Sequence, residues 1–290
     1  MKKVVVIAGP TASGKTDIAL KLAKSIGGYI INGDSRQVYK YLDIGTAKPI
    51  FDRQLSDNTY MLNGIRHYLF NILDPKENFT LFEYQRAVKK IISETQGIPI
   101  LVGGSGLYID SVVFNYILTR NDIKDTTLDS MSVSQLQQLA KEYLPLMSDS
   151  DRKNRHRLIR AIQRGSVNQK KGKTFNHIYF VMDIKKEILE KRVRDRIEKM
   201  FKDGLLEENI YLLEKGYTYE DKGMNSIGYI EFKEYINNNI SLEEVKENIF
   251  KNTMSYIKRQ RTWFKRNKNS IWVSNEDEIF QEALNFISKE

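Results

Sequence analysis

The 290-residue chain contains no cysteine. Disulfide bonds and thiolate metal sites are therefore excluded, and this composition fits a reducing cytoplasm, the expected location. No apolar run approaches the roughly 20 residues of a membrane-spanning helix, so we expect no membrane partner. The first residues lead directly into an apolar run, without the layout of a secretory signal. There is no internal repeat, and a monomer is the default expectation.

Acidic residues are absent from two parts of the chain, which concentrates its positive charge there. The whole sequence has 46 basic and 37 acidic residues, a net charge of +9. Residues 152–182 contain nine basic residues and no acidic one, and residues 254–275 contain six and none. The overall excess only hints at a polyanionic partner, whereas its distribution is more informative.

The motif GPTASGKT occupies residues 9–16. It follows an apolar, β-branched run at residues 4–8, which predicts a buried parallel strand, and precedes apolar positions with helical spacing at residues 16–25. Glycines on such a turn let backbone N–H groups and the helix N-terminus surround a phosphate. Lys15 would add a point charge, and the Thr16 hydroxyl is the expected Mg²⁺ ligand. The predicted phosphate-binding residues are Gly9, Pro10, Thr11, Ala12, Ser13, Gly14, Lys15 and Thr16.

Three further predicted strands end in residues of chemical interest. Asp34 follows a strand at residues 29–32, where it could face the crevice beside the phosphate loop or cap the next turn, and position alone does not decide. The strand at residues 99–102 ends in Gly-Gly-Ser, where a Walker B strand would end in a metal-binding Asp. Asp183 ends a later strand and leads into a helix, so we interpret it as a helix cap. The lack of an obvious metal-binding Asp argues against ATP hydrolysis.

The pattern predicts an α/β fold, a parallel sheet like that of phosphate-loop NTPases flanked by helices. Its core would comprise residues 1–114 and 175–290, with a mainly helical insertion domain at residues 115–174. Capping boxes at Thr80 and Ser241 open two of the core helices. Helices are predicted at residues 81–95, 107–113, 185–201, 205–214 and 242–265, from residue 276, and in the insertion at 128–146 and 151–164.

Arginines on two predicted helices are candidates for phosphate contact. Arg192 and Arg196 share a face of helix 185–201, where they could clamp a phosphate or pair with acidic neighbours in the same helix. Arginines on helix 151–164 also share a face. Such runs are usually solvated, but the missing counter-charges favour contact with a phosphate backbone.

Basic and aromatic residues alternate at residues 258–266, a pattern that suits contacts to phosphates and bases. At least one of Trp263 and Phe264 is instead expected in the core.

The chain resembles the tRNA dimethylallyltransferases, also called tRNA isopentenyltransferases. The DIGTAKP ending at residues 43–49 is the most specific feature, because many kinases share the phosphate loop. The likeness is weakest at residues 115–149, from which no functional residue is carried over. The matching motifs are GPTASGKT from Gly9, DSRQVYKYLDIGTAKP from Asp34, PILVGGSGLY from Pro99, RLIRAI from Arg157, SIGYIEF from Ser226 and KRQRTWF from Lys258.

The resemblance implies transfer of a dimethylallyl group from its diphosphate to the N6 amine of the adenosine just 3′ of the anticodon in tRNA. Lys15, Thr11, Asp34 and Arg196, with Arg192 as the alternative to Arg196, would carry the catalysis, with Mg²⁺ on Thr16. Asp34 would accept the amine proton. The residues that the resemblance assigns to tRNA binding are Asp34, Ser35, Arg36, Gln37, Ser105, His156, Arg157, Leu158, Ile159, Arg160, Lys258, Arg259 and Arg261.

Other classes of function remain open from the sequence. A phosphate-loop small-molecule kinase would bind ATP and turn it over without tRNA. An adenylate isopentenyltransferase acting on free nucleotides fits the loop equally well, although the basic tracts favour tRNA. A basic RNA-binding module with a relic loop would bind tRNA without releasing diphosphate.

Overall fold

The computed structural model describes residues 2–118, 126–167 and 170–289 and divides into two compact units. The core unit comprises residues 1–113 and 175–290, and the helical unit comprises residues 114–174. Residues 119–125 and 168–169 of the predicted insertion lie outside the described residues. In the described ranges, no helix combines the length and apolar character needed to cross a bilayer.

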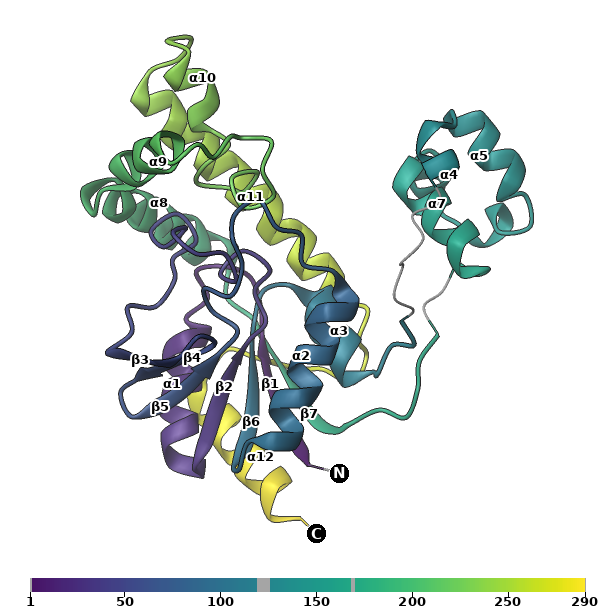
Figure 1. Cartoon of the computed structure of the whole chain (residues 1–290). Coiled ribbons are helices and arrows are strands. Elements are labelled where there is room, and N and C mark those ends of the chain that lie inside the picture. Colours follow the sequence, from purple (N-terminus) through teal and green to yellow (C-terminus); the bar gives the residue numbers. More distant parts are fainter. Residues whose placement is uncertain (1, 119–125, 168–169, 290) are drawn as a thin grey trace. The chain divides into compact units, whose positions relative to one another are not determined.

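The core unit is built on an eight-stranded sheet with the order β3-β4-β5-β2-β6-β1-β7-β8 (Figure 1). In this order, the six strands β5-β2-β6-β1-β7-β8 pair in parallel with their neighbours. The pairs β3–β4 and β4–β5 are antiparallel. The predicted α/β fold with a parallel sheet is thereby confirmed. The strands are β1 (Lys3–Ala8), β2 (Gly28–Asn32), β3 (Arg53–Ser56), β4 (Thr59–Leu62), β5 (Ile65–Tyr68), β6 (Ile98–Gly103), β7 (Asn176–Met182) and β8 (Ile271–Val273).

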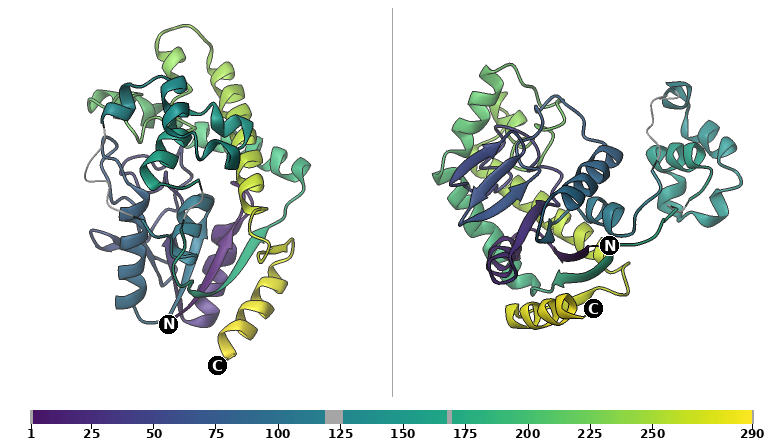
Figure 2. Two further views of the ribbon diagram at one scale, coloured as in Figure 1. Left: turned by 90° about the vertical axis from the view of Figure 1, so that its right-hand side faces the viewer. Right: turned by 60° about the horizontal axis from the view of Figure 1, so that its bottom comes forward.

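Helices cover both faces of this sheet, which explains why its central strands are apolar throughout. Helices α1 (Lys15–Ile26) and α12 (Glu276–Ser288) lie on one face, and α2 (Leu81–Glu94) and α3 (Gly106–Val113) on the other (Figures 1 and 2). The apolar residues of β1 are 0% exposed from Val4 to Ala8. A strand buried on both faces has a continuous apolar sequence rather than an alternating one.

A layer of helices lies beyond the carboxyl ends of the strands, where ligands bind in open α/β sheets. It contains α8 (Lys186–Lys202), α9 (Leu205–Glu214), α10 (Phe232–Ile236) and α11 (Leu242–Phe264). Its own core includes Leu189, Val193 and Phe232, together with buried residues of the loop after β2. The Ser241 capping box begins α11 as predicted.

The helical unit has a separate small core, which includes Leu136, Leu158 and Ile159. The continuous helices predicted here are wrong, because local caps divide them. Ser132 begins a new helix by a capping box, and the Asn154 side chain accepts from the Arg157 N–H to begin another. The observed elements are α4 (Thr126–Ser130), α5 (Val133–Leu139), the 3₁₀ turn η1 (Leu144–Leu146), α6 (Asp149–Arg152) and α7 (Arg155–Arg164).

The antiparallel strands β3, β4 and β5 were not predicted. All four residues of β3 are exposed and only Leu55 is apolar, so the strand carries no apolar pattern. The turn between β4 and β5 did carry a signal, since Asn63-Gly64 is the preferred pair for a two-residue hairpin. Both residues adopt the positive φ angles of that turn, 51° and 77°.

The interpretation of Asp183 as a helix cap is wrong. Helix α8 begins at Lys186, and its N-cap residue Lys185 makes no side-chain capping bond. The Asp183 carboxylate instead accepts from the Arg261 guanidinium at 2.8 Å. An aspartate that ends a strand can thus stabilise a neighbouring helix through a salt bridge rather than cap its own.

Substitution of Gly103 tests whether the close approach of β6 and β2 needs a residue without a side chain. A Cβ atom at Gly103 would lie 2.1 Å from the Gly33 backbone, which cannot rotate away. We expect Gly103→Ala to lower the free energy of unfolding by at least about 3 kcal/mol, the upper end of the range for overpacking. Gly64→Ala, in open space, should cost only the roughly 1–2 kcal/mol of a left-handed φ. Urea denaturation that found equal losses in both variants would contradict this reason.

Candidate active site

The phosphate loop has the backbone conformation that its sequence predicts. Gly9 and Gly14 have φ angles of 150° and 85°, which disfavour residues with a Cβ atom. A Cβ on Gly9 would also lie 2.8 Å from the Met182 side chain. Helix α1 begins at Lys15, directly after the loop, so its free N–H groups point towards any anion that the loop holds.

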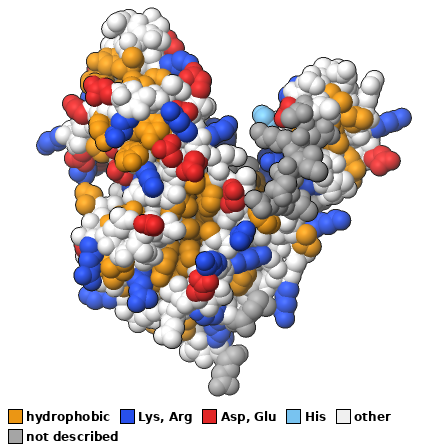
Figure 3. All heavy atoms as spheres, viewed as in Figure 1, with side chains coloured by type: hydrophobic (Ala, Val, Ile, Leu, Met, Phe, Trp, Pro, Cys, Tyr) orange, Lys and Arg blue, Asp and Glu red, His pale blue; other side chains and the backbone are white. Residues whose placement is uncertain are grey.

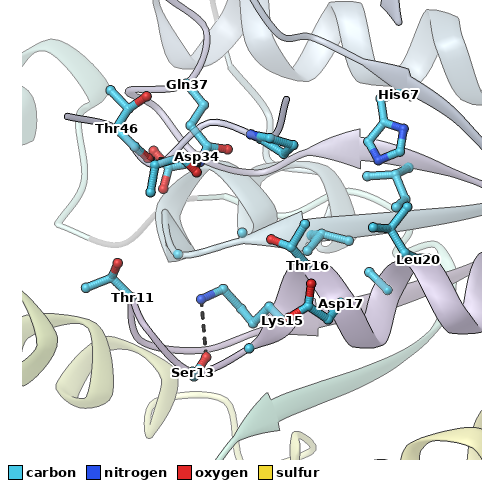
Figure 4. A pocket seen from close by; sticks show the side chains of 18 of the residues that line it. Thr11, Ser13, Lys15, Thr16, Asp17, Leu20, Asp34, Gln37, Thr46 and His67 are labelled. Atoms are coloured by element: carbon cyan, nitrogen blue, oxygen red, sulfur yellow. Dashed lines mark hydrogen bonds between the residues drawn. The ribbon is translucent and has the colours of Figure 1, made fainter. Parts of the chain in front are cut away.

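Lys15 lies inside this loop rather than in solvent. Its Nζ donates to the Pro10 carbonyl oxygen at 2.6 Å and to Ser13 Oγ at 3.3 Å (Figure 4). Burial lowers the pKa of Lys15 to about 7, with a further decrease from Arg196 and a smaller opposing effect of Asp34. A bound polyanion would favour the charged form again. The site thus holds an under-compensated cation that an anionic ligand would stabilise.

Arg196, rather than Arg192, extends to the centre of the site. Its Nη1 donates to Thr11 Oγ1 at 3.1 Å, and burial lowers its pKa, partly opposed by Asp17. Arg192 is exposed and donates to the Ala12 carbonyl oxygen at 3.4 Å. The sequence left the two arginines undecided, and the geometry favours Arg196 as the phosphate clamp.

Asp34 lies at the end of β2, as predicted. One carboxylate oxygen, Oδ1, accepts from the Arg36 backbone N–H at 2.8 Å, which is the turn-capping arrangement. Within the described part of the chain, Oδ2 accepts no hydrogen bond. Asp34 can therefore cap its turn and still present an oxygen to a ligand.

The loops after β2 and β6 are joined by hydroxyl groups. The Ser35 N–H donates to Ser105 Oγ at 3.0 Å, and the Ser105 hydroxyl donates to Ser35 Oγ at 3.1 Å. Gln37, also predicted at the site, donates through Nε2 to the carbonyl oxygens of Thr46 and Ala47. Arg36 is exposed and donates to the Lys222 carbonyl oxygen at 2.9 Å.

Two cavities meet at these residues. One, of about 450 Å³, contains the phosphate loop and extends along α1 to His67 (Figure 4). The other, of about 330 Å³, has an apolar wall from α8 and α11 and extends to Tyr256 and Arg259. The two share a small set of lining residues, which defines the junction: Thr11, Asp34, Thr46, Ala47 and Arg196.

Sequence reasoning missed Gln260 within the motif that it assigned to tRNA. Gln260 is 4% exposed; its Oε1 accepts from the Thr11 N–H and its Nε2 donates to the Gly104 carbonyl oxygen, both at 3.0 Å. It thus ties the phosphate loop to the loop after β6. A polar residue between two basic ones gives no sign of burial. Only its helical spacing from the apolar residues of α11 could have suggested that Gln260 is buried. Thr46 and Ala47 were likewise missed as lining residues.

The two aromatic residues after Gln260 are both packed. Phe264 is 1% exposed, as expected for at least one of the pair. Trp263 donates through Nε1 to Asp110 at 2.7 Å, and its ring lies where a Cβ on Gly106 would be. These contacts make Trp263 a support for α3 rather than a free stacking surface.

The residues predicted to bind tRNA differ in accessibility. His156, Arg157 and Arg160 are exposed on α7, whereas its Leu158 and Ile159 lie in the core of the helical unit. The premise that Arg157 lacks a counter-charge is wrong, because Asp151 just before the basic tract lies 3.7 Å from its Nε.

On α11, Lys258 and Arg259 are exposed, and Arg259 lies over the Tyr256 ring at 5.6 Å. Arg261 is different, since it pairs with Asp183 and donates to the Ile184 carbonyl oxygen. On the face of the core unit shown in Figure 3, basic and acidic side chains are interspersed. This face of the core unit is therefore not uniformly positive.

The site could hold a metal ion only together with a ligand. Among the described residues, no three His, Asp or Glu side chains converge on one point. The Thr16 hydroxyl is exposed to the larger cavity, beside Asp17. This donor set fits Mg²⁺, which retains several waters and binds through one or two protein groups plus substrate phosphates.

Comparisons with known proteins show the family of the chain. Residues 37–267 match the family model described as IPP transferase. A tRNA dimethylallyltransferase of Onion yellows phytoplasma (strain OY-M) is 38% identical over 273 residues, which cover 91% of this chain and 90% of the relative.

Two solved structures are similar over nearly the whole chain. The tRNA isopentenylpyrophosphate transferase of Bacillus halodurans has a TM-score of 0.74 at 30% identity and covers 99% of this chain and 96% of its own. The tRNA delta(2)-isopentenylpyrophosphate transferase of Staphylococcus epidermidis has a TM-score of 0.72 at 31% identity and covers 100% of both chains. Because the family model matches most of the chain and these relatives are 30–38% identical over nearly its whole length, the chain belongs to the IPP transferase family.

Proposed function

We propose that this protein transfers a dimethylallyl group from dimethylallyl diphosphate to the N6 amine of the adenosine just 3′ of the anticodon in tRNA, releasing diphosphate. One observation carries the proposal. Asp34, Lys15 and Arg196 all line the larger cavity, and Asp34 and Arg196 also line the second cavity, which has an apolar wall. The named relatives support the reaction class.

The diphosphate would occupy the phosphate loop. Loop N–H groups, Lys15 and Arg196 would stabilise the negative charge that builds as the allylic C1–O bond breaks. Arg196 already bonds Thr11, so the clamp needs no large movement. Mg²⁺, held by Thr16 and the diphosphate oxygens, would supply further charge stabilisation. The bonding electrons leave with the diphosphate, and no hydrolytic water has to be activated.

Asp34 would receive the proton of the amine. The N6 lone pair is shared with the adenine ring, so the amine is a weak nucleophile that needs an acceptor for its proton. As the new N6–C1 bond forms, that proton passes to Oδ2 of Asp34, the oxygen outside the turn cap. The adenosine must leave its stack to reach this point, through the second chamber.

Contacts to the tRNA backbone would come from exposed basic residues. Arg157 and Arg160 on α7 and Lys258 and Arg259 on α11 are accessible, and the pKa of the adjacent Arg164 is lowered by burial and by the charges of Arg160 and Arg157. The three neighbouring arginines on α7 favour binding of a polyanion. Because Arg261 is held by Asp183, we assign it a structural role instead.

Substitution of Lys15 tests the diphosphate assignment. Lys15→Ala removes the buried point charge, so single-turnover transfer from dimethylallyl diphosphate should fall by about 100-fold or more. Binding of tRNA in a filter assay should persist, because the basic residues on α7 and α11 are unchanged. Near-normal turnover by the variant would contradict the assignment.

Substitution of Asp34 separates a base from a metal ligand. Asp34→Asn keeps the turn-capping acceptor but cannot take a proton, so transfer should slow by about 10²- to 10⁴-fold while both substrates still bind. Single-turnover rates should be measured across a Mg²⁺ titration, with a melting curve for each protein. Recovery of the rate at high Mg²⁺ would instead identify a metal ligand, and a near-normal rate at every Mg²⁺ concentration would contradict the base assignment.

Neutralising Arg160 tests the tRNA contact. Arg160→Gln should weaken tRNA binding for all substrate sequences and reduce the salt dependence by roughly one counterion. Lys24→Gln serves as the control, since Lys24 is exposed in the last turn of α1, remote from the carboxyl ends of the strands. If the salt dependence of the tRNA binding constant were unchanged in Arg160→Gln, Arg160 would be an ordinary solvent-exposed residue without a tRNA contact.

A further inference from the structure

The loop of residues 36–49 connects the two chambers of the site. Gln37, Thr46, Ala47 and Pro49 line the larger cavity, and Gly45 with Thr46 and Ala47 lines the smaller one. Except for an isolated bridge at Tyr39, none of these residues belongs to a helix or strand. Backbone hydrogen bonds, such as that from the Lys40 N–H to the Leu73 carbonyl oxygen at 2.8 Å, hold the start of the loop, and two charged anchors hold its remaining residues.

The first anchor is Glu208 on α9. Its carboxylate accepts from three successive backbone N–H groups of the loop, those of Asp43 at 3.1 Å, Ile44 at 2.9 Å and Gly45 at 3.2 Å. Three amides converging on one carboxylate form a concave anion site. Here the protein's own side chain fills that site, so the loop is held to the helical layer without a ligand.

Tyr229 completes this anchor from the other side. Its hydroxyl donates to Glu208 at 2.5 Å and accepts from the Gly45 N–H at 3.1 Å. Burial, together with the Glu208 charge, raises the pKa of Tyr229, so its proton is retained. A Cβ on Gly45 would lie 2.5 Å from the Tyr229 ring, which leaves no room for the loop to shift inward.

The second anchor is Lys48, at the far end of the loop. Its side chain is only 2% exposed. Nζ donates to the Tyr39 carbonyl oxygen at 2.7 Å, to Asp43 Oδ1 at 2.5 Å and to Asn71 Oδ1. A buried ammonium with three oxygen partners is satisfied, and it ties both ends of the loop to the segment after β5.

We propose that Glu208, acting through the 43–45 amides and Tyr229, is a positioning residue for the transfer reaction, because it fixes Thr46 and Ala47 at the junction of the two chambers. Glu208 itself lines neither cavity. This role rests on the proposed function, since it concerns how the two substrates are aligned. The anchor does not touch the phosphate loop, so it should affect alignment and leave diphosphate binding unchanged.

Glu208→Gln in the full chain tests this proposal. The amide keeps one acceptor but turns N–H groups towards the loop amides, so the convergent arrangement fails. Single-turnover transfer from dimethylallyl diphosphate to unmodified tRNA should fall roughly 10- to 100-fold, the effect of misplacing a reacting group by about 1 Å. Calorimetric binding of inorganic diphosphate should be unchanged, and hydrogen exchange at amides 43–47 should be faster.

Two further variants complete the design. Tyr229→Phe removes one hydroxyl without changing the packing, and it should give the same pattern with a smaller rate loss. Glu207→Gln makes the identical charge change at an exposed neighbour on α9 and should match the wild type. If Glu208→Gln does not fold, the transfer rate and the hydrogen exchange of Tyr229→Phe alone test the positioning role.

A wild-type rate in Glu208→Gln despite faster loop exchange would overturn the proposal. So would a parallel loss of diphosphate affinity and of exchange protection in β1, since that pattern reports general destabilisation. Absence of transfer by the wild-type protein would overturn the proposed function and the positioning role together, whereas the exchange data would still measure the anchor itself.

Discussion

The site depends on how closely the carboxyl ends of β2 and β6 approach. The Gly33 N–H donates to the Val102 carbonyl oxygen at 2.6 Å, and the Ser105 N–H donates to the Gly33 carbonyl oxygen at 3.0 Å. The missing side chains of Gly33 and Gly103 make this contact possible. It places the loops after the two strands side by side, so that Asp34 and Ser105 lie next to the phosphate loop that follows β1. Parallel pairing brings all three loops to one edge of the sheet.

Uncompensated positive charge is the second feature of the site. Lys15 and Arg196 are both partly buried. Arg196 lowers the pKa of Lys15, and Arg192 lowers the pKa of Arg196. Burial of two cations near each other disfavours the charged forms unless an anion joins them. An anionic ligand such as a diphosphate would therefore relieve an unfavourable interaction that Asp34 and Asp17 offset only in part. A leaving group that gains negative charge during the reaction would relieve it further, which is the condition for catalysis by differential binding.

Apart from Arg196 on α8, the helical layer contributes order rather than chemistry. Gln260 on α11 holds the phosphate loop, and Glu208 on α9 holds the loop of residues 36–49. Both use side chains to satisfy backbone groups that no helix or strand satisfies, and a buried backbone donor without a partner would be costly. Thr11 and Asp34 thus lie on loops, and side chains from rigid helices fix the position of these loops. This division explains why residues remote from the chemistry in sequence can control it.

The sequence by itself determined the elements whose signal is local. The phosphate loop, the capping boxes and the parallel strands β1, β2, β6 and β7 follow from glycine spacing, short polar motifs and apolar runs, and the family resemblance followed from motifs in order. What only the tertiary structure decided is which polar residues face each other. The choice of Arg196 over Arg192, the pairing of Arg261 with Asp183 and the anchoring of the loop by Glu208 all join segments far apart in the chain. Such pairs depend on helix phase and strand order together, which no short stretch of sequence encodes.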